Sequence, residues 1–189
     1  LPPGTSVPNR VHGAFVDGSS WQAVHTSLTK KGYTVRVVQN TTQSLSTDVE
    51  NTLEALSSLT GKTLLVGHSY GGAVITNAGH HAAVAGLVYV AALVPDIGES
   101  VAQLISTPPQ DAPKAPLLEP LNGKLYLDTT KFAQAFAADI SVSQAAFMAD
   151  SQSGFGLKAI NEKTTMAAWK EKPSWYLVTQ KDNMVPVIT

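Results

Sequence analysis

The feature that most constrains the fold is a pentapeptide, Gly-His-Ser-Tyr-Gly at residues 67–71, between an apolar run and a helical pattern. The apolar run, residues 63–66, reads as a buried strand, and the residues after the second glycine favour a helix. A serine flanked in this way is typical of a nucleophile whose hydroxyl must stand clear of the backbone. Glycine permits the tight turn because it has no Cβ to clash. The competing interpretation is a glycine-rich connection in which Ser69 has no chemical role.

Four segments are rich in valine and leucine without strict alternation, which is typical of strands buried in a parallel sheet. Helical spacing lies between them, as in the recurrence of Trp21, Val24 and Leu28 and of apolar residues over 45–56. Strand–helix–strand order requires right-handed crossovers. We therefore predict a single α/β domain, residues 1–189, with a doubly wound, mainly parallel sheet. Its strands are expected at residues 33–38, 63–67, 85–94 and 174–179.

The ends of two elements carry further expectations. Thr47 and Glu50 have the spacing of a capping box at the start of the helix over 45–56. Before Val11 a first strand is expected to be shortened or absent. Pro8 lacks a backbone donor, and Arg10 is costly on a strand buried on both faces.

The regular order breaks after Pro95. Residues 106–123 contain five prolines, which predicts an extended loop, and residues 128–138 and 141–149 then have the pattern of short helices. An insertion of this kind, about 96–170, commonly forms a lid over a pocket. We expect Phe136, Phe147 and Met148 to contribute to a substrate pocket. Packing within the lid is the alternative for each of them.

Composition excludes several classes of function. The net charge of −1 gives no electrostatic reason to expect a nucleic acid or an anionic membrane as partner. No apolar run is long enough to span a bilayer, and residues 1–10 contain no signal-peptide core, so a cytoplasmic location is favoured. The chain has no cysteine, which excludes disulfides and thiolate chemistry.

Taken together, four ordered segments resemble the α/β-hydrolase superfamily, and within it the small esterases with light caps that are related to hydroxynitrile lyases and plant ester hydrolases. The resemblance implies an α/β-hydrolase fold with a small helical lid. It also implies hydrolysis of a small-molecule carboxylic ester through an acyl-serine intermediate, without a metal or organic cofactor. It implies nothing about the oligomeric state. The four segments are residues 11–21, 65–75, 86–92 and 172–178.

Particular residues receive roles from this resemblance. Ser69 would be the nucleophile, and the backbone N–H groups of Tyr70 and Ala14 would bind the oxyanion. Phe15 would line the substrate pocket. Asp182, just after the last predicted strand, would be the acid of a catalytic triad. A plain turn residue is the alternative reading of Asp182.

The sequence offers a second candidate for the triad acid and no histidine in the chain order expected for the base. Asp96 is the second choice for the acid, because some superfamily members place it after that strand. Chain order in this fold is serine, acid, histidine, yet every histidine precedes Asp182. His12 and His68 lie beside the chemistry, but we expect local packing or hydrogen bonding for both rather than the role of base. The others are His25, His80 and His81.

The resemblance further implies roughly 40 residues beyond Thr189: a helix, a last strand, a histidine loop and a closing helix. We therefore expect a C-terminally truncated chain that lacks the last strand and helices and is impaired in turnover. Three alternatives to a working esterase stay open: an inactive fragment, a small-molecule-binding pseudo-enzyme, and hydroxynitrile lyase-like activity.

Overall fold

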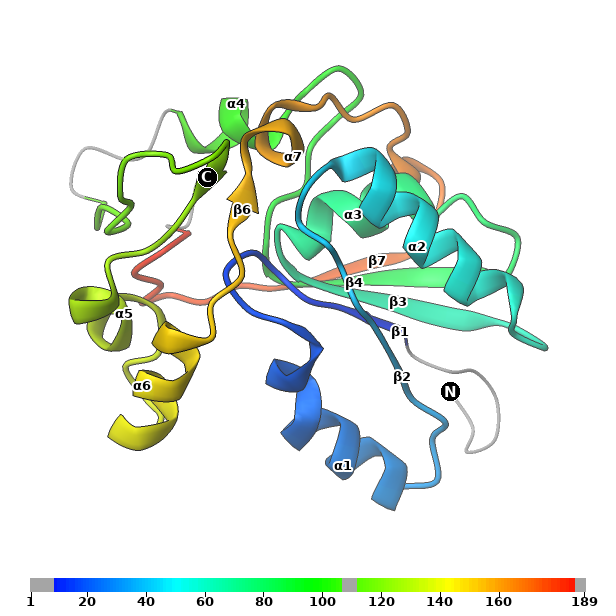
Figure 1. Ribbon diagram of the computed structural model, residues 1–189. Helices are drawn as coiled ribbons and strands as arrows, with labels where there is room; N and C mark the ends of the chain where they lie inside the picture. Colours follow the sequence, from blue (N-terminus) through cyan, green and yellow to red (C-terminus); the bar gives the residue numbers. More distant parts are fainter. Residues whose placement is uncertain (1–8, 107–111, 186–189) are drawn as a thin grey trace.

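A computed structural model of the chain describes residues 9–106 and 112–185 and contains a five-stranded sheet in the order β2-β1-β3-β4-β7 (Figure 1). All four pairings are parallel, as predicted. The chain passes from β1 outward to β2 and returns to β3 on the other side of β1. Ligands of open α/β sheets bind at such a switch, beyond the carboxyl ends of the strands. The strands are β1 Asn9–Val11, β2 Arg36–Val38, β3 Thr63–Ser69, β4 Val84–Ala92 and β7 Ser174–Leu177.

Helices lie on both sides of the sheet. Helices α2 (Leu45–Ser57) and α3 (Gly71–Ala78) cover one face, and α1 (Gln22–Lys30) lies on the other, after a 3₁₀ helix at Gly18–Trp21 (Figure 1). Every residue of α3 is buried, whereas α1 buries none. The apolar spacing of Trp21, Val24 and Leu28 predicted the position of α1 correctly. It did not predict the low burial of the helix, in which Val24 is 41% exposed.

The segment between β4 and β7 forms a cover beyond the carboxyl ends of the strands (Figure 1). The helices predicted at 128–138 and 141–149 are present as α5 and α6. Residues 112–123 of the predicted loop contain no helix, and residues 107–111 lie outside the described part. The elements are α4 Val101–Ile105, β5 Lys124–Leu125, α5 Thr129–Phe136, α6 Val142–Asp150, β6 Phe155–Gly156, α7 Leu157–Asn161 and a 3₁₀ helix at Ala168–Lys170.

The start of α2 differs from the expectation. Ser44 is the N-cap, with an extended backbone (φ −150°, ψ 146°), and its hydroxyl accepts a hydrogen bond from the Thr47 amide. The capping box at Thr47 and Glu50 is therefore wrong. The helix begins earlier because Ser44 already supplies the acceptor that the first turn needs.

Strand β1 is short, as expected, but it occupies an interior position of the sheet between β2 and β3. Arg10 is 1% exposed there, with its guanidinium 5.8 Å from the centre of the Trp21 ring. Burial lowers the pKa of Arg10. Its Nε and Nη1 atoms have no hydrogen-bond partner within the described ranges. Hydrogen bonding of β1 to two neighbouring strands thus outweighs the cost of burying Arg10, the cost on which the expectation of an absent strand rested.

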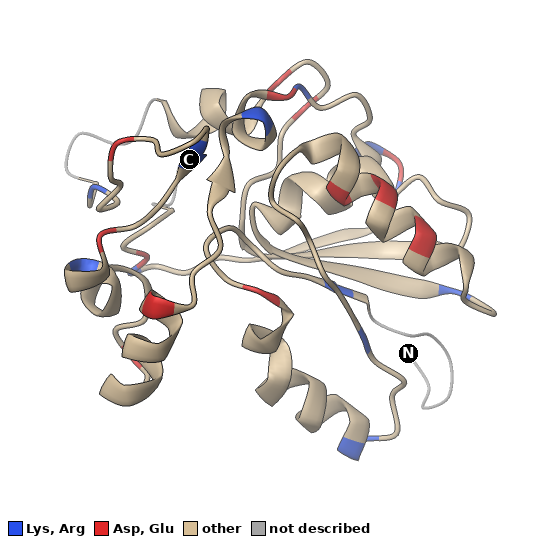
Figure 2. Cartoon of the chain, in the orientation of Figure 1, with Lys and Arg blue, Asp and Glu red and all other residues tan. Residues whose placement is uncertain are grey.

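Strand β7 is parallel to β4, as predicted, but it is not buried. It lies at the edge of the sheet, and all four of its residues are exposed, with Trp175 at 56% and Leu177 at 55%. No helix in residues 9–106 or 112–185 is long and apolar enough to cross a membrane. Lysine and arginine are dispersed over several elements (Figure 2).

Candidate active site

Ser69 stands at a strained turn between β3 and α3. Its φ of +51° is in the left-handed region, which residues with a Cβ seldom adopt. The flanking glycines are required by close backbone contacts: a Cβ on Gly67 would lie 2.5 Å from the Gly71 carbonyl oxygen, and one on Gly71 would lie 2.5 Å from that of Val11. The strained strand-to-helix turn predicted from the sequence is confirmed.

Strand β4, which pairs with β3, also constrains this turn. The register between β3 and β4 shifts after His68, so that Ser69 pairs with Ala92, and Ala91 takes a φ of +42°. Just beyond, the Leu93 amide donates a 3.0 Å hydrogen bond to the Ser69 carbonyl. Such irregularities are frequent next to active sites, where they re-aim a side chain.

Two backbone segments lie against Ser69. Tyr70 immediately precedes α3, so its amide is at the positive end of that helix. On the other side, a Cβ on Gly13 would lie 2.8 Å from the Ser69 Cβ. Ala14 follows that contact and is 4% exposed, and Phe15 then takes a φ of +65°. The two loops expected to supply the oxyanion donors are therefore both adjacent to Ser69.

A cavity of about 420 Å³ opens beside Ser69 and is lined mainly by apolar side chains. Phe15 and Phe136 are among them, as expected. The cover contributes most of the rest, and the loop after β7 adds Met184 and Val185. Lys114 is the one charged side chain among the described lining residues. The further apolar lining residues include Leu93, Val101, Ile105, Leu117, Leu125, Phe155 and Ile160.

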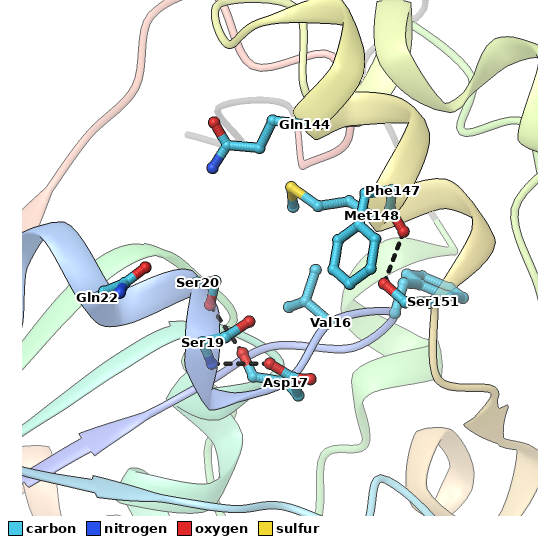
Figure 3. Close-up of a pocket in the computed structure, with 10 residues that line it drawn as sticks. Val16, Asp17, Ser19, Ser20, Gln22, Gln144, Phe147, Met148 and Ser151 are labelled. Atoms are coloured by element: carbon cyan, nitrogen blue, oxygen red, sulfur yellow. Dashed lines mark hydrogen bonds between the residues drawn. The ribbon is translucent and has the colours of Figure 1, made fainter.

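Phe147 and Met148 lie elsewhere. They line a second cavity of about 240 Å³, between α6 and the 3₁₀ helix before α1 (Figure 3). Phe15 borders both cavities. Phe147 is 70% exposed. The structure therefore does not bring these two residues to the Ser69 cavity, because α6 presents them to the Asp17–Gln22 segment instead.

The two candidate acids have different surroundings. Asp96 pairs with Lys170 at 2.6 Å and accepts a hydrogen bond from the Ile97 amide, near the surface. Asp182 is partly buried, accepts hydrogen bonds from the Met184 and Val185 amides, and interacts electrostatically with His68, the neighbour of Ser69. The loop that Asp182 organises is the one that reaches the Ser69 cavity.

Both nitrogens of His12 are engaged. Its Nε2 accepts from the Asn40 amide at 2.8 Å, so its Nδ1 carries the proton and donates to the Gly13 carbonyl at 2.8 Å. Burial lowers the pKa of His12, which keeps the ring neutral. His12 therefore supports the loop that carries Gly13 and has no free nitrogen with which to act as a base.

The other histidines are also not hydrogen-bonded to Ser69. Burial lowers the pKa of His68, with a partial offset from Asp182, and its ring packs edge-on to Trp21. His80 pairs with Glu171, and Nδ1 of His81 accepts from the Ala83 amide. His25 is on α1, on the other face of the sheet from α3 (Figure 1), whereas Ser69 is the last residue of β3. All five histidines are within the described residues, and none of them is hydrogen-bonded to Ser69 there.

One buried polar residue beside this site, Asp48, was not predicted from the sequence. Asp48 is 0% exposed, and its carboxylate accepts a 2.9 Å hydrogen bond from the Tyr70 hydroxyl. A signal was present, because Leu45, Asp48, Thr52 and Leu56 follow helical spacing, and an acid on such a stripe faces the core. The cavity residues from α4, β6 and α7 had no comparable signal.

The fold is shared with solved structures of a hydrolase and of two esterases. A pyrethroid hydrolase from Sphingobium faniae matches with a TM-score of 0.78 and 20% identity, over 96% of this chain and 81% of that one. Polyneuridine aldehyde esterase matches with a TM-score of 0.78 and 16% identity, over 97% and 83%. A methylesterase from Arabidopsis matches with 0.73 and 16%, over 96% and 80%.

Sequence comparison identifies the family itself. No curated protein matches the chain. The model of the alpha/beta hydrolase family, however, matches residues 11–188, which is nearly the whole chain. The match spans the strained turn at Ser69, the Gly13 loop and the segment that carries Asp182. The chain is therefore a member of the alpha/beta hydrolase family.

Proposed function

We propose that this chain is a carboxylic ester hydrolase in which Ser69 attacks the ester carbonyl and forms an acyl-serine intermediate. The observation that carries the proposal is the left-handed backbone of Ser69 at a strand-to-helix turn that opens on an apolar cavity. The tetrahedral oxyanion would accept hydrogen bonds from the Tyr70 and Ala14 amides. Fixed donors of this kind stabilise charge that develops only in the transition state.

The substrate class follows from the cavity. A space of about 420 Å³ with one charged lining residue favours an ester with an apolar acyl or alcohol part of moderate size. The similar structures whose names describe esterases support this reading. Phe15 and Phe136 would contact the apolar part of such an ester.

Asp182 is our proposed triad acid. Its charge acts on His68, the neighbour of Ser69, and its loop contributes Met184 and Val185 to the Ser69 cavity, whereas Asp96 pairs with Lys170. None of the five histidines is hydrogen-bonded to Ser69 in the described residues. We therefore propose that these 189 residues turn over esters slowly. The loss of one triad member costs on the order of 10⁴ to 10⁶ in turnover.

Chemical rescue tests this proposal. Hydrolysis of p-nitrophenyl acetate is measured with and without imidazole, for the chain and for Ser69→Ala, with folding checked by circular dichroism. Imidazole in solution can take the place of a missing general base. We expect imidazole to raise the Ser69-dependent rate at least about tenfold, with an acetyl group on Ser69 detected by intact mass. Equal rates for the chain and for Ser69→Ala at every imidazole concentration would refute Ser69 as the nucleophile.

A second candidate, ligand binding without turnover, is favoured by one observation: both nitrogens of His12 are occupied and no other imidazole bonds to Ser69. The same experiment separates the two. An apolar ester that binds the folded chain, but leaves no adduct on Ser69 even with imidazole, would support a binding protein.

A further inference from the structure

Asp48 is a buried carboxylate to which the proposed reaction assigns no role. Helix α2 carries three acidic residues, visible in red in Figure 2. Glu50 and Glu54 are exposed, but Asp48 is fully buried. A charged carboxylate leaves water at a cost of several kcal/mol, so its partners must hold it firmly.

Those partners are neutral donors. Asp48 accepts from the Thr41 amide at 2.6 Å, the Thr41 hydroxyl at 2.9 Å and the Thr42 amide at 3.1 Å. The fourth donor is the Tyr70 hydroxyl at 2.9 Å. Among the described residues no lysine or arginine pairs with it. Because several donors converge on one carboxylate, they fix the positions of the groups that supply them.

Asn40, the residue before Thr41, contacts the loop that carries Gly13, which also lies against Ser69. The Asn40 amide donates to Nε2 of His12, and Nδ2 of Asn40 donates to the His12 carbonyl, both at 2.8 Å. Residues 40–42, which we call the brace, therefore join Asp48 to the loop that carries Gly13. The brace is itself constrained, since Thr42 has a φ of +56° and donates its hydroxyl to the Gly154 carbonyl at 3.0 Å.

The side chain and the backbone of Tyr70 are both fixed. Its hydroxyl donates a hydrogen bond to Asp48, and the centre of its ring lies 4.9 Å from that of Phe155. Its backbone forms the N-cap of α3. Burial, reinforced by the charge of Asp48, raises the pKa of Tyr70, so the hydroxyl stays protonated and donates. A side chain fixed in this way limits rotation of the peptide between Ser69 and Tyr70.

We propose that Asp48 is a positioning residue that, through Tyr70 and the brace, sets the two amides that receive the oxyanion. This inference rests on the proposed function. It explains why a fully buried acid lies between two loops that approach Ser69 from opposite sides. Its effect belongs to the covalent step, because the amides act on the tetrahedral intermediate rather than on the bound ester.

The test compares two buried tyrosine hydroxyls. Tyr70→Phe removes the bond to Asp48 and keeps the ring and the amide, and Asp48→Asn removes the charge. Tyr89→Phe is the matched control: Tyr89 is 2% exposed, and its hydroxyl pairs with that of Thr76 at 2.9 Å, outside the Ser69 cavity. Phosphonylation of Ser69 by an alkyl fluorophosphonate, with imidazole present, is resolved into a dissociation constant and a rate constant for the covalent step.

We expect Tyr70→Phe and Asp48→Asn to lower the rate constant about tenfold, with an unchanged dissociation constant. This is less than the roughly 100- to 1000-fold loss for removal of an oxyanion donor, because the amides would be displaced and not removed. Tyr89→Phe should stay within about twofold of the parent chain. Equal effects of Tyr70→Phe and Tyr89→Phe would overturn the inference.

Hydrogen exchange of the peptide spanning residues 66–74 provides a readout that does not depend on reaction. We expect faster exchange in Tyr70→Phe than in Tyr89→Phe. If the parent chain does not react at Ser69, the proposed function fails. The exchange comparison still decides whether Tyr70 and Asp48 hold the turn, and equal exchange in the two variants would refute that.

Discussion

At the scale of single residues, the site depends on contacts that leave no room for a methyl group. Gly13 is the case that involves Ser69 directly, because a Cβ there would meet the Ser69 Cβ at 2.8 Å, and that Cβ lies on a strained backbone that cannot shift freely. The carbonyl of Gly13 also accepts a hydrogen bond from Nδ1 of His12. A displacement at this position would move both Ser69 and the Gly13 loop.

Gly13→Ala should therefore lower the rate of Ser69 phosphonylation roughly 100-fold, the loss typical of a misplacement of about 1 Å. Gly123→Ala is the control, since Gly123 has a φ of +75° but nothing within 4 Å of an added Cβ. That variant should lose some stability while labelling stays within about twofold. Labelling by Gly13→Ala at the parent rate would show that the Gly13 loop is not needed for the reaction.

At the scale of elements, α2 shows how a helix start couples to the site. Its N-cap Ser44 precedes Asp48 by one turn and is separated from the brace by one residue, Gln43. Fixing the first turn of α2 also fixes the carboxylate that Tyr70 contacts. The cap is buried, with Ser44 at 4% exposure.

Ser44→Ala should lower the free energy of unfolding by about 1 kcal/mol, because the Thr47 amide would lose its acceptor. Glu50→Ala, on the exposed side of α2, should change it by less than about 0.5 kcal/mol. Urea unfolding of both variants measures this. A larger loss in Glu50→Ala would restore the capping box expected from the sequence.

The elements predicted correctly are those with a local signal. The strand ending at Ser69 and the helix after it were evident, because apolar runs and flanking glycines encode them within a few residues. Phe147 and Met148 were misplaced because helical spacing gives a face, but not the rotation of α6 against the Asp17–Gln22 segment. The residues of β7 themselves gave no sign that Trp175 is exposed, since an apolar run alone cannot distinguish an edge strand from an interior one.

At the scale of the whole molecule, several titratable groups are withdrawn from water, among them Asp48 and His12. Asp48 is held by neutral donors, and His12 is neutral because both its nitrogens bond to backbone. Burial lowers the pKa of both His12 and His68. The folded state therefore takes up protons less readily than the unfolded chain when the pH falls below the ordinary histidine range. The stability of the fold becomes sensitive to mild acid.

We expect the free energy of unfolding to fall as the pH is lowered from 7.5 to 5.5. An unfolded histidine binds its proton near pH 6.5, whereas His12 and His68 in the fold do so only at lower pH, so below 6.5 the unfolded state holds more protons. The stabilisation is complete above pH 6.5 and is lost at up to about 1.4 kcal/mol per pH unit for each histidine. Urea unfolding across this range measures the slope, and work above pH 5 avoids the carboxyl groups. His68→Phe keeps an aromatic ring against Trp21 and should reduce the slope by about half. A flat profile in the parent chain would mean that neither imidazole is held neutral by the fold.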